Sequence, residues 1–257
     1  MNHSNQTIPN RFKERIISRE TLIGCWASLA HDITTEILGL VGFDWLLIDL
    51  EHAPNDLQTC RHQLNALKGS RSAPVVRPPA NDVVALKRLL DLGFMNVLIP
   101  HVESASEAAQ AVAATRFPPA GIRGVSLSQR SNRYGMQSEY LHQVNDEVCV
   151  LLQIETLKGI ENLEDILQVD GVDGIFIGPA DLSASLGCFG QADNPKVQEK
   201  MQQIYEKCVA YGKAVGTLAT NDTDAKRYLD AAYNFVAVGT DQGLFRDAAL
   251  ELYRRFS

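Results

Sequence analysis

The chain carries acids, an arginine and a histidine at or just after the ends of short apolar runs, where a buried strand is expected to end. They are Asp49, His52, Arg77, Glu155 and Asp181. Carboxylates bind hard divalent cations, a guanidinium holds an anionic oxygen, and an imidazole exchanges a proton near neutral pH. Together, such side chains can stabilise a developing negative charge and move one proton.

Glu155 and Asp181 follow consecutive runs, and adjacent strands of a sheet are about 4.8 Å apart. Two carboxylates at that separation repel each other unless one is protonated or a cation lies between them. A hard ion such as Mg²⁺ or Mn²⁺, bound by two carboxylates and several waters, fits this pattern. In the alternative interpretation, each acid only caps the helix that follows. Zinc is disfavoured, because no histidine or cysteine pair has the spacing of zinc ligands.

Two further side chains are candidates for handling the charge and the proton. Arg77 is predicted to hold a carboxylate or enolate oxygen, unless it forms an ion pair on the outside of the fold. His52 is a candidate general base, unless it is a structural loop histidine, and His101 occupies a similar position. Imine chemistry is disfavoured, because Lys158 alone among the nine lysines closely follows a strand end, and it lies at the start of a helix.

Eight short apolar runs alternate with amphipathic segments. Runs without polar alternation are typical of parallel strands buried on both faces. The runs are 22–28, 44–49, 73–77, 96–100, 148–155, 174–178, 214–218 and 235–239; the predicted helices include 34–41, 56–68, 82–92, 106–115, 159–167, 195–211, 222–232 and 247–256. Eight repeats in about 250 residues predict an α/β fold, a single-domain (β/α)8 TIM barrel. A doubly wound sheet competes, but no run leads into a Gly-x-Gly-x-x-Gly turn.

The barrel is expected to span residues 1–257 as one domain, with a flexible N-terminal extension at 1–10. The connection 116–147 is unusually long, and we expect it to be a loop over the barrel mouth. Catalytic side chains of such barrels lie at the carboxyl ends of the strands. The polar residues named above should therefore converge on one cavity.

The composition limits the partners. Twenty-four basic and 31 acidic residues give a net charge of −7, which disfavours nucleic acid and anionic membranes. A local basic pocket could still bind an anionic metabolite. The five cysteines form no Cys-x-x-Cys pair, and the first 19 residues contain no apolar signal segment. We expect a cytoplasmic protein with reduced thiols that acts on small molecules.

Several motifs, in order along nearly the whole chain, resemble the class II pyruvate aldolases of the HpcH/HpaI family. They lie at 43–49, 51–56, 73–78, 89–93, 121–125, 153–155 and 174–182. The resemblance implies a metal-dependent carbon–carbon lyase that uses Mg²⁺, with Mn²⁺ or Co²⁺ able to substitute. It also implies a homohexamer, a trimer of dimers, in which helices swap or pack between subunits.

The resemblance gives each catalytic candidate a role. Glu155 and Asp181 would hold the metal, which pyruvate chelates. Arg77 would bind the keto oxygen and stabilise the enolate. His52, oriented by Asp91, would take the proton from the hydroxyl group that becomes the aldehyde.

Further positions surround that set in the family. Gln153, Ala180 and Leu218 would line the pyruvate pocket, and Asp49 would support the metal-bound waters or His52. Leu50 departs from the family, which usually has Gly or Ala there. A bulky residue either packs harmlessly or narrows the site, so the departure bears on the aldehyde preference and not on the metal site.

The implied reaction is the reversible retro-aldol cleavage of 2-dehydro-3-deoxyglucarate or 5-dehydro-4-deoxyglucarate to pyruvate and tartronate semialdehyde. The alternative substrate is 4-hydroxy-2-oxoheptanedioate, which would give pyruvate and succinate semialdehyde. Cleavage of citryl- or malyl-coenzyme A is a third option, but the chain offers no obvious basic nucleotide-binding surface. A catalytically silent barrel that binds a metabolite is the interpretation from another class.

Overall fold

Parallel strands close a barrel in chain order. The computed structural model describes residues 9–219 and 221–257, and within them the barrel has eight strands. The strands are β1 (Leu22–Ala27), β2 (Trp45–Asp49), β3 (Ala73–Arg77), β4 (Asn96–Ile99), β5 (Cys149–Ile154), β6 (Gly174–Ile177), β7 (Ala214–Leu218) and β8 (Phe235–Thr240). This confirms the predicted (β/α)8 barrel, and each predicted strand is correct to within one residue at either end.

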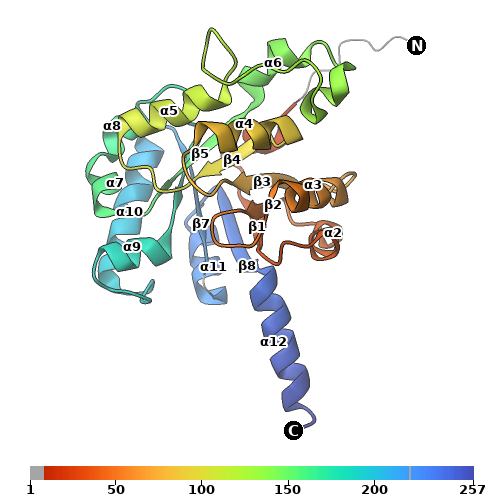
Figure 1. Ribbon diagram of the computed structural model, residues 1–257. Helices are drawn as coiled ribbons and strands as arrows, with labels where there is room; N and C mark the ends of the chain where they lie inside the picture. Colours follow the sequence, from red (N-terminus) through yellow and green to blue (C-terminus); the bar gives the residue numbers. More distant parts are fainter. Residues whose placement is uncertain (1–8, 220) are drawn as a thin grey trace.

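Helices cover the barrel, except α12, which projects away from it (Figure 1). They are α1 (Arg11–Ile17), α2 (Asp32–Val41), α3 (Leu57–Ala66), α4 (Val83–Leu92), α5 (Ala105–Thr115), η1 (Arg130–Gly135), α6 (Tyr140–Glu147), α7 (Leu157–Glu161), α8 (Leu163–Leu167), α9 (Pro179–Ser185), α10 (Pro195–Ala210), α11 (Asp222–Asp230) and α12 (Asp241–Arg254). One predicted helix is in fact two, α7 and α8, with a break at Asn162. The last helix begins six residues earlier than predicted.

The 116–147 connection is not a loop over the barrel mouth, so that prediction is wrong. It joins the end of α5 to the start of β5, and a helix-to-strand connection returns to the amino-terminal end of a barrel. It contains η1 and α6, and Arg130 donates to the carbonyl of Leu92, the last residue of α4. In Figure 1 this connection lies at the upper end of the molecule, whereas α12 leaves from the lower end.

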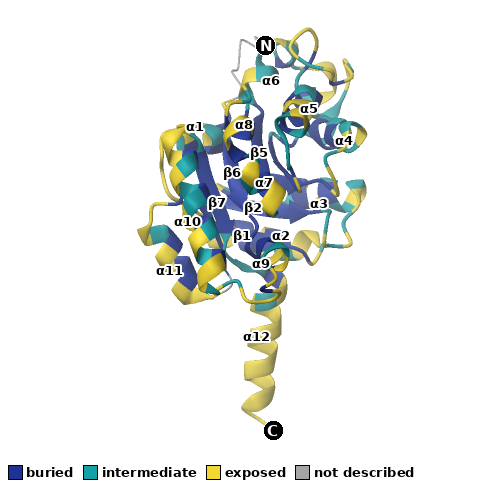
Figure 2. Cartoon of the chain, turned by 90° about the vertical axis from the view of Figure 1, so that its left-hand side faces the viewer, coloured by how far each residue is buried: buried dark blue, intermediate teal, exposed yellow. Residues whose placement is uncertain are grey.

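Two apolar layers hold the barrel together. Inside it, rings from several strands meet: Trp45 and Phe235 lie 6.0 Å apart, centroid to centroid, and Trp26 and Phe176 lie 5.5 Å apart. Phe12 of α1 joins this cluster at the amino-terminal end, so α1 closes the floor of the barrel. A larger cluster fills the space between strands and helices, and Figure 2 shows the strands as the most buried part of the chain.

The termini and surface bear on two further predictions. The predicted extension at residues 1–10 falls mostly outside the described residues, but Asn10 is buried and caps α1. All five cysteines lie in the described chain, where they are buried and unpaired. None of the described helices is long and apolar enough to cross a membrane.

The interior packing predicts that Gly216→Ala destabilises the barrel. An added Cβ at Gly216 would lie 2.2 Å from the ring of Phe235 and 2.5 Å from its backbone oxygen. We expect a loss of about 3 kcal/mol in the free energy of unfolding, measured with urea. The control is Gly239→Ala, whose Cβ meets nothing within 4 Å. Equal losses in the two variants would contradict this account of the packing.

Candidate active site

A buried ion pair joins the ends of β2 and β3. Parallel register sets Asp49 directly opposite Arg77. Arg77 Nε donates to Asp49 Oδ1 at 2.9 Å, and Nη2 donates to Oδ2 at 2.7 Å. Burial alone would raise the pKa of Asp49, but the hydrogen bonds and charge of Arg77 hold it below its ordinary value. Asp49 therefore anchors Arg77 in this structure, in addition to any support it gives to water or His52.

Three more side chains fix the guanidinium. Glu51 Oε2 lies 2.8 Å from Arg77 Nη1, as an ion pair without an aligned hydrogen bond. Gln153 Oε1 accepts from the same nitrogen at 3.4 Å, and the ring of Trp26 lies below the guanidinium at 5.1 Å. Arg77 is thus held on several sides before any substrate arrives, and it is not the external ion pair of the alternative interpretation.

Glu155 follows β5 with its carboxylate buried. Its side chain accepts from Gln153 Nε2 and from the backbone N–H of His101, the latter at 3.0 Å. His101 has a left-handed backbone, with φ of 54°, which directs this N–H at the carboxylate. A Cβ at Gly178 would lie 2.6 Å from Glu155 Oε2, so glycine at the end of β6 leaves room for the acid.

The charge of Asp181 acts on the buried carboxylate of Glu155. Burial and the negative charge of Asp181 raise the pKa of Glu155 to about 7. Burial also raises the pKa of Glu51, where Arg77 opposes the effect and Asp181 adds to it. Asp181 itself is exposed in the first turn of α9. Several carboxylates thus share one small region at the strand ends, and a cation there would lower their mutual repulsion.

In this structure His52 and Asp91 each lie beside another residue: His52 beside Glu51, and Asp91 beside Arg123. His52 Nε2 lies 3.8 Å from Glu51, and its side chain is 66% exposed. Asp91 Oδ1 accepts from Arg123 Nη2 at 2.9 Å. The orientation of His52 by Asp91 stays a prediction, and among the described residues Glu51 is the acid that lies near His52.

The predicted pocket residues occupy three different elements. Gln153 is buried near the end of β5, where it bridges Arg77 and Glu155. Leu218 is the last residue of β7, and Ala180 lies in the first turn of α9. Leu50, the departure from the family, packs partly buried against the cluster between strands and helices.

Sequence reasoning missed three contributions to the site. Glu51 was visible between Asp49 and His52, but nothing in the spacing linked it to Arg77. The ring of Trp26 contacts the Arg77 guanidinium from β1, 51 residues earlier in the chain. His101 contributes its backbone N–H, and the type of residue at a position does not reveal such a contact.

The arrangement can hold an oxyanion and exchange a proton. Arg77 offers fixed positive charge, the nearby acids can compensate a bound cation, and His52 stands exposed beside them. No group of three or more metal-ligating side chains is found among residues 9–219 and 221–257. Two acids with water and substrate oxygens remain a ligand set that magnesium accepts. A barrel with this site has the architecture of an enzyme that stabilises a carbanion or enolate.

The chain belongs to the HpcH/HpaI aldolase/citrate lyase family, whose model matches residues 22–248. A protein of Enterobacter sp. (strain 638), named 5-keto-4-deoxy-D-glucarate aldolase, is 54% identical over 98% of this chain and 99% of its own length. The crystal structure of a family protein from Burkholderia cenocepacia J2315 has a TM-score of 0.93 at 39% identity, covering 96% of this chain and 100% of that one. The family predicted from the motifs is confirmed, and the protein is an aldolase-type lyase.

A more distant relative shares the fold. It is the citrate lyase beta subunit from M. tuberculosis, complexed with oxaloacetate and magnesium. Its TM-score is 0.58 at 16% identity, and the match covers 87% of this chain and 92% of that one.

Burial of Glu155 predicts a pH-dependent stability in metal-free protein. The folded chain keeps this proton up to a pKa of about 7, whereas the unfolded chain releases it near 4.5. Stability should therefore fall as the pH rises through this window, by up to about 3 kcal/mol. Urea unfolding with chelator from pH 5 to 8 measures the fall, which should shrink in Glu155→Gln.

The matched control is Glu164→Gln, because Glu164 is an exposed acid paired with Lys207. It should reproduce the wild-type slope. An unchanged slope in Glu155→Gln would show that Glu155 does not carry the buried proton.

Proposed function

We propose that the protein cleaves 5-keto-4-deoxy-D-glucarate, also called 5-dehydro-4-deoxyglucarate, to pyruvate and tartronate semialdehyde, with Glu155 and Asp181 holding a divalent metal. The observation that carries this proposal is the buried Glu155, placed beside Asp181 and linked through Gln153 to Arg77. The name of the Enterobacter relative supports the substrate. It favours the glucarate over the heptanedioate alternative.

The residues present fit a hard divalent cation. A buried carboxylate whose pKa is raised to about 7 by burial and Asp181 gains from a nearby positive charge. Two acids leave room for waters and for substrate oxygens, as Mg²⁺ prefers, and Mn²⁺ or Co²⁺ could replace it. The magnesium in the M. tuberculosis citrate lyase beta subunit supports this choice. When bound, the metal would supply Lewis-acid stabilisation of the pyruvate oxygens.

Arg77 stabilises the charge that cleavage produces. Breaking the carbon–carbon bond leaves its electron pair on the pyruvate fragment, as an enolate. Asp49 and Glu51 hold the guanidinium in place, so little reorganisation accompanies this charge. Gln153, Ala180 and Leu218 line the pocket for the pyruvate half in this proposal.

His52 accepts the proton that cleavage releases. The hydroxyl group next to the breaking bond loses its proton to the imidazole and becomes the aldehyde carbonyl. The enolate carbon then takes up a proton, returned by the imidazolium of His52 directly or through water, and becomes the methyl group of pyruvate. Glu51 Oε2 lies 3.8 Å from His52 Nε2, and Asp91 is the further orienting residue that the family implies.

The reaction is tested by pyruvate release coupled to lactate dehydrogenase. Chelation should abolish the release, and Mg²⁺ should restore it. Glu155→Ala should lower kcat/KM at least about a hundredfold in saturating metal, whereas Glu164→Ala should not change it. Full metal-dependent cleavage by Glu155→Ala would reject the metal role. Faster cleavage of 4-hydroxy-2-oxoheptanedioate would reject the substrate.

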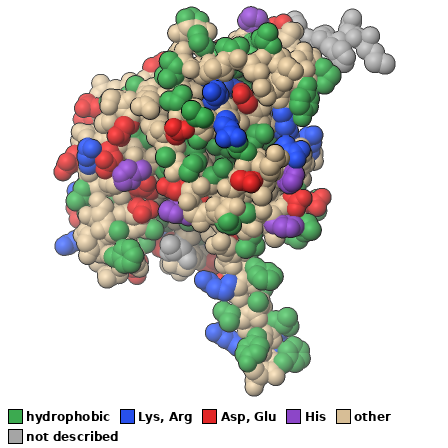
Figure 3. Space-filling model, viewed as in Figure 1, with side chains coloured by type: hydrophobic (Ala, Val, Ile, Leu, Met, Phe, Trp, Pro, Cys, Tyr) green, Lys and Arg blue, Asp and Glu red, His purple; other side chains and the backbone are tan. Residues whose placement is uncertain are grey.

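We also propose that the protein is a homohexamer, because α12 lacks a packing surface in the single chain. Figures 1 and 2 show it projecting from the barrel, and its apolar side chains are exposed (Figure 3). They include Leu244, Phe245, Leu252 and Tyr253. Asp241 fixes the root of the helix by accepting from the backbone of Ser28 and Leu29.

A second copy is the occupant that the surface of this chain favours. Near the root of α12, α2 exposes an apolar stripe of its own, formed by Ile33, Ile37, Leu40 and Val41. Two such faces per chain can bury each other in a symmetric assembly. The five buried, unpaired thiols accord with the reducing cytoplasm, which we propose as the location.

Phe245→Asp should reduce the assembly to smaller species, as measured by light scattering after size-exclusion chromatography. A charge at this 72%-exposed position would face the apolar partner surface. Arg246→Ala on the same helix is the control, because its side chain pairs only with the exposed Asp247 in the described chain. A monomeric wild-type protein would contradict the proposal.

A further inference from the structure

Arg123 is a fully buried arginine of the 116–147 connection. Its Nη2 donates to Asp91 Oδ1 at 2.9 Å and to the hydroxyl of Tyr140 at 3.3 Å. Its Nε and Nη1 have no hydrogen-bond partner among the residues that the structure describes. Within those residues Asp91 is also the one acid that pairs with it. A buried guanidinium with two unpaired donors is destabilising, so the burial of Arg123 depends on Asp91.

Two aromatic rings and the backbone hold Arg123 in place. Its guanidinium carbon lies 4.4 Å from the ring centre of Phe117 and 6.0 Å from that of Tyr140. The backbone N–H of Arg123 donates to the carbonyl of Arg116 at 2.9 Å. A Cβ at Gly121 would lie 2.5 Å from that same carbonyl oxygen, so glycine lets the segment approach the end of α5. The segment thus holds its arginine beside α4.

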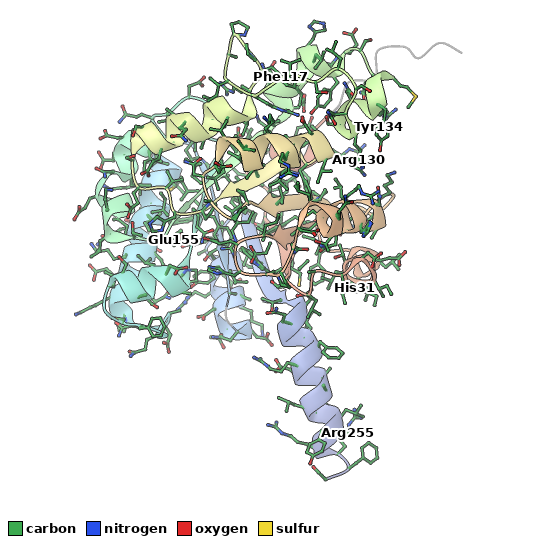
Figure 4. The ribbon with its side chains drawn as sticks, viewed as in Figure 1. His31, Phe117, Arg130, Tyr134, Glu155 and Arg255 are labelled. Carbon is green, nitrogen blue, oxygen red and sulfur yellow. The ribbon has the colours of Figure 1, made fainter. Side chains whose placement is uncertain are left out.

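The same connection holds the end of α4 at a second point. Asp91 lies in the last turn of α4, where an acid meets the negative end of the helix dipole. Arg123 offsets this charge, and Arg130 Nη1 donates to the carbonyl of Leu92. Figure 4 shows Arg130 beside α4, away from Glu155 of the active site. Two arginines of one connection therefore fix the last two residues of α4.

The carboxylate of Asp91 has an oxygen left for another donor. Its Oδ2 accepts no hydrogen bond from the described residues, and the side chain is 22% exposed. α4 ends at the amino-terminal end of the barrel, whereas His52 follows β2 at the carboxyl-terminal end. The pairing of Asp91 with His52 that the family implies therefore needs two chains of the proposed assembly.

We propose that Arg123 is a positioning residue: its buried guanidinium fixes the carboxylate of Asp91, whose second oxygen orients His52 of a neighbouring chain. This role rests on the proposed function. A carboxylate that rotates freely would orient the imidazole only part of the time, whereas one held by a buried charge is preorganised before the substrate binds. The 116–147 connection thereby acts in catalysis through Asp91 and not at the mouth of its own barrel.

A double-mutant cycle tests this role, with pyruvate release from 5-keto-4-deoxy-D-glucarate measured at saturating Mg²⁺. Arg123→Met fills the space beside the rings but removes the charge. It should lower kcat at least about tenfold and change KM less than about twofold, because Arg77 and the acids of the site stay in place. Asp91→Asn should cause a similar loss, and adding Arg123→Met to it should change kcat less than about twofold.

Two companion variants separate positioning from folding. Arg123→Lys keeps a charged donor for Asp91, so its kcat should lie between those of the wild type and Arg123→Met. Arg116→Met removes an arginine of the same connection whose partner, Asp170, is fully exposed, and it should leave kcat unchanged. Unfolding midpoints report whether each variant folds. If Arg123→Met does not fold, the cycle is run with Arg123→Lys, whose smaller loss should likewise vanish in the Asp91→Asn background.

The role of Arg123 is overturned if either single variant of the cycle keeps the wild-type kcat, if their losses multiply, or if KM rises in place of a fall in kcat. It is also overturned if Arg123→Lys is as slow as Arg123→Met. A wild type that releases no pyruvate rejects the proposed function, and this role with it. The results above, obtained with an active wild type, reject the role of Arg123 alone.

Discussion

Asp49 and Arg77 face each other at the ends of neighbouring strands, and the site depends on the ion pair between them. Both side chains are buried, where an unpaired charge costs several kcal/mol. The pair therefore requires β2 and β3 to keep their register, since a shift by one residue would turn either side chain to the other face. The barrel fixes the position of the Arg77 guanidinium, and the ion pair of that guanidinium in turn restricts the register of β2 and β3.

The acids around Arg77 follow from the same constraint. Glu51 shares the guanidinium, and Gln153 connects it to Glu155. The site places more negative than positive charge in a confined space, and the raised pKa of Glu155 is the cost of this arrangement. A protein optimised for stability alone would not bury that carboxylate beside Asp181. Such a cost is expected where charge compensation by a bound species is part of function.

The sequence predicts the barrel because its strands lack alternation and its helices have clear caps, as at Asp82. It predicts the positions of Glu155 and Arg77 because strand ends share one face in a barrel. It does not predict which acid meets Arg77, since this depends on the register between strands. It also misplaces the 116–147 connection. The length of this segment suggests a functional loop, but it does not indicate whether the segment lies at the carboxyl-terminal or the amino-terminal end of the barrel. The sequence does not predict that α1 closes the floor of the barrel, because its two buried residues, Phe12 and Ile16, lie in a short polar segment.

His101 shows how a strand end can support catalysis without specifying a side chain. Its contribution to Glu155 is a main-chain N–H, directed by a left-handed backbone. The imidazole is largely exposed, and lies 3.7 Å from Glu155 and 3.8 Å from Glu103. The carboxylate is therefore secured by a part of the chain that mutation of the side chain leaves in place. Position 101 is therefore one where the side chain can change while the backbone anchoring of Glu155 persists.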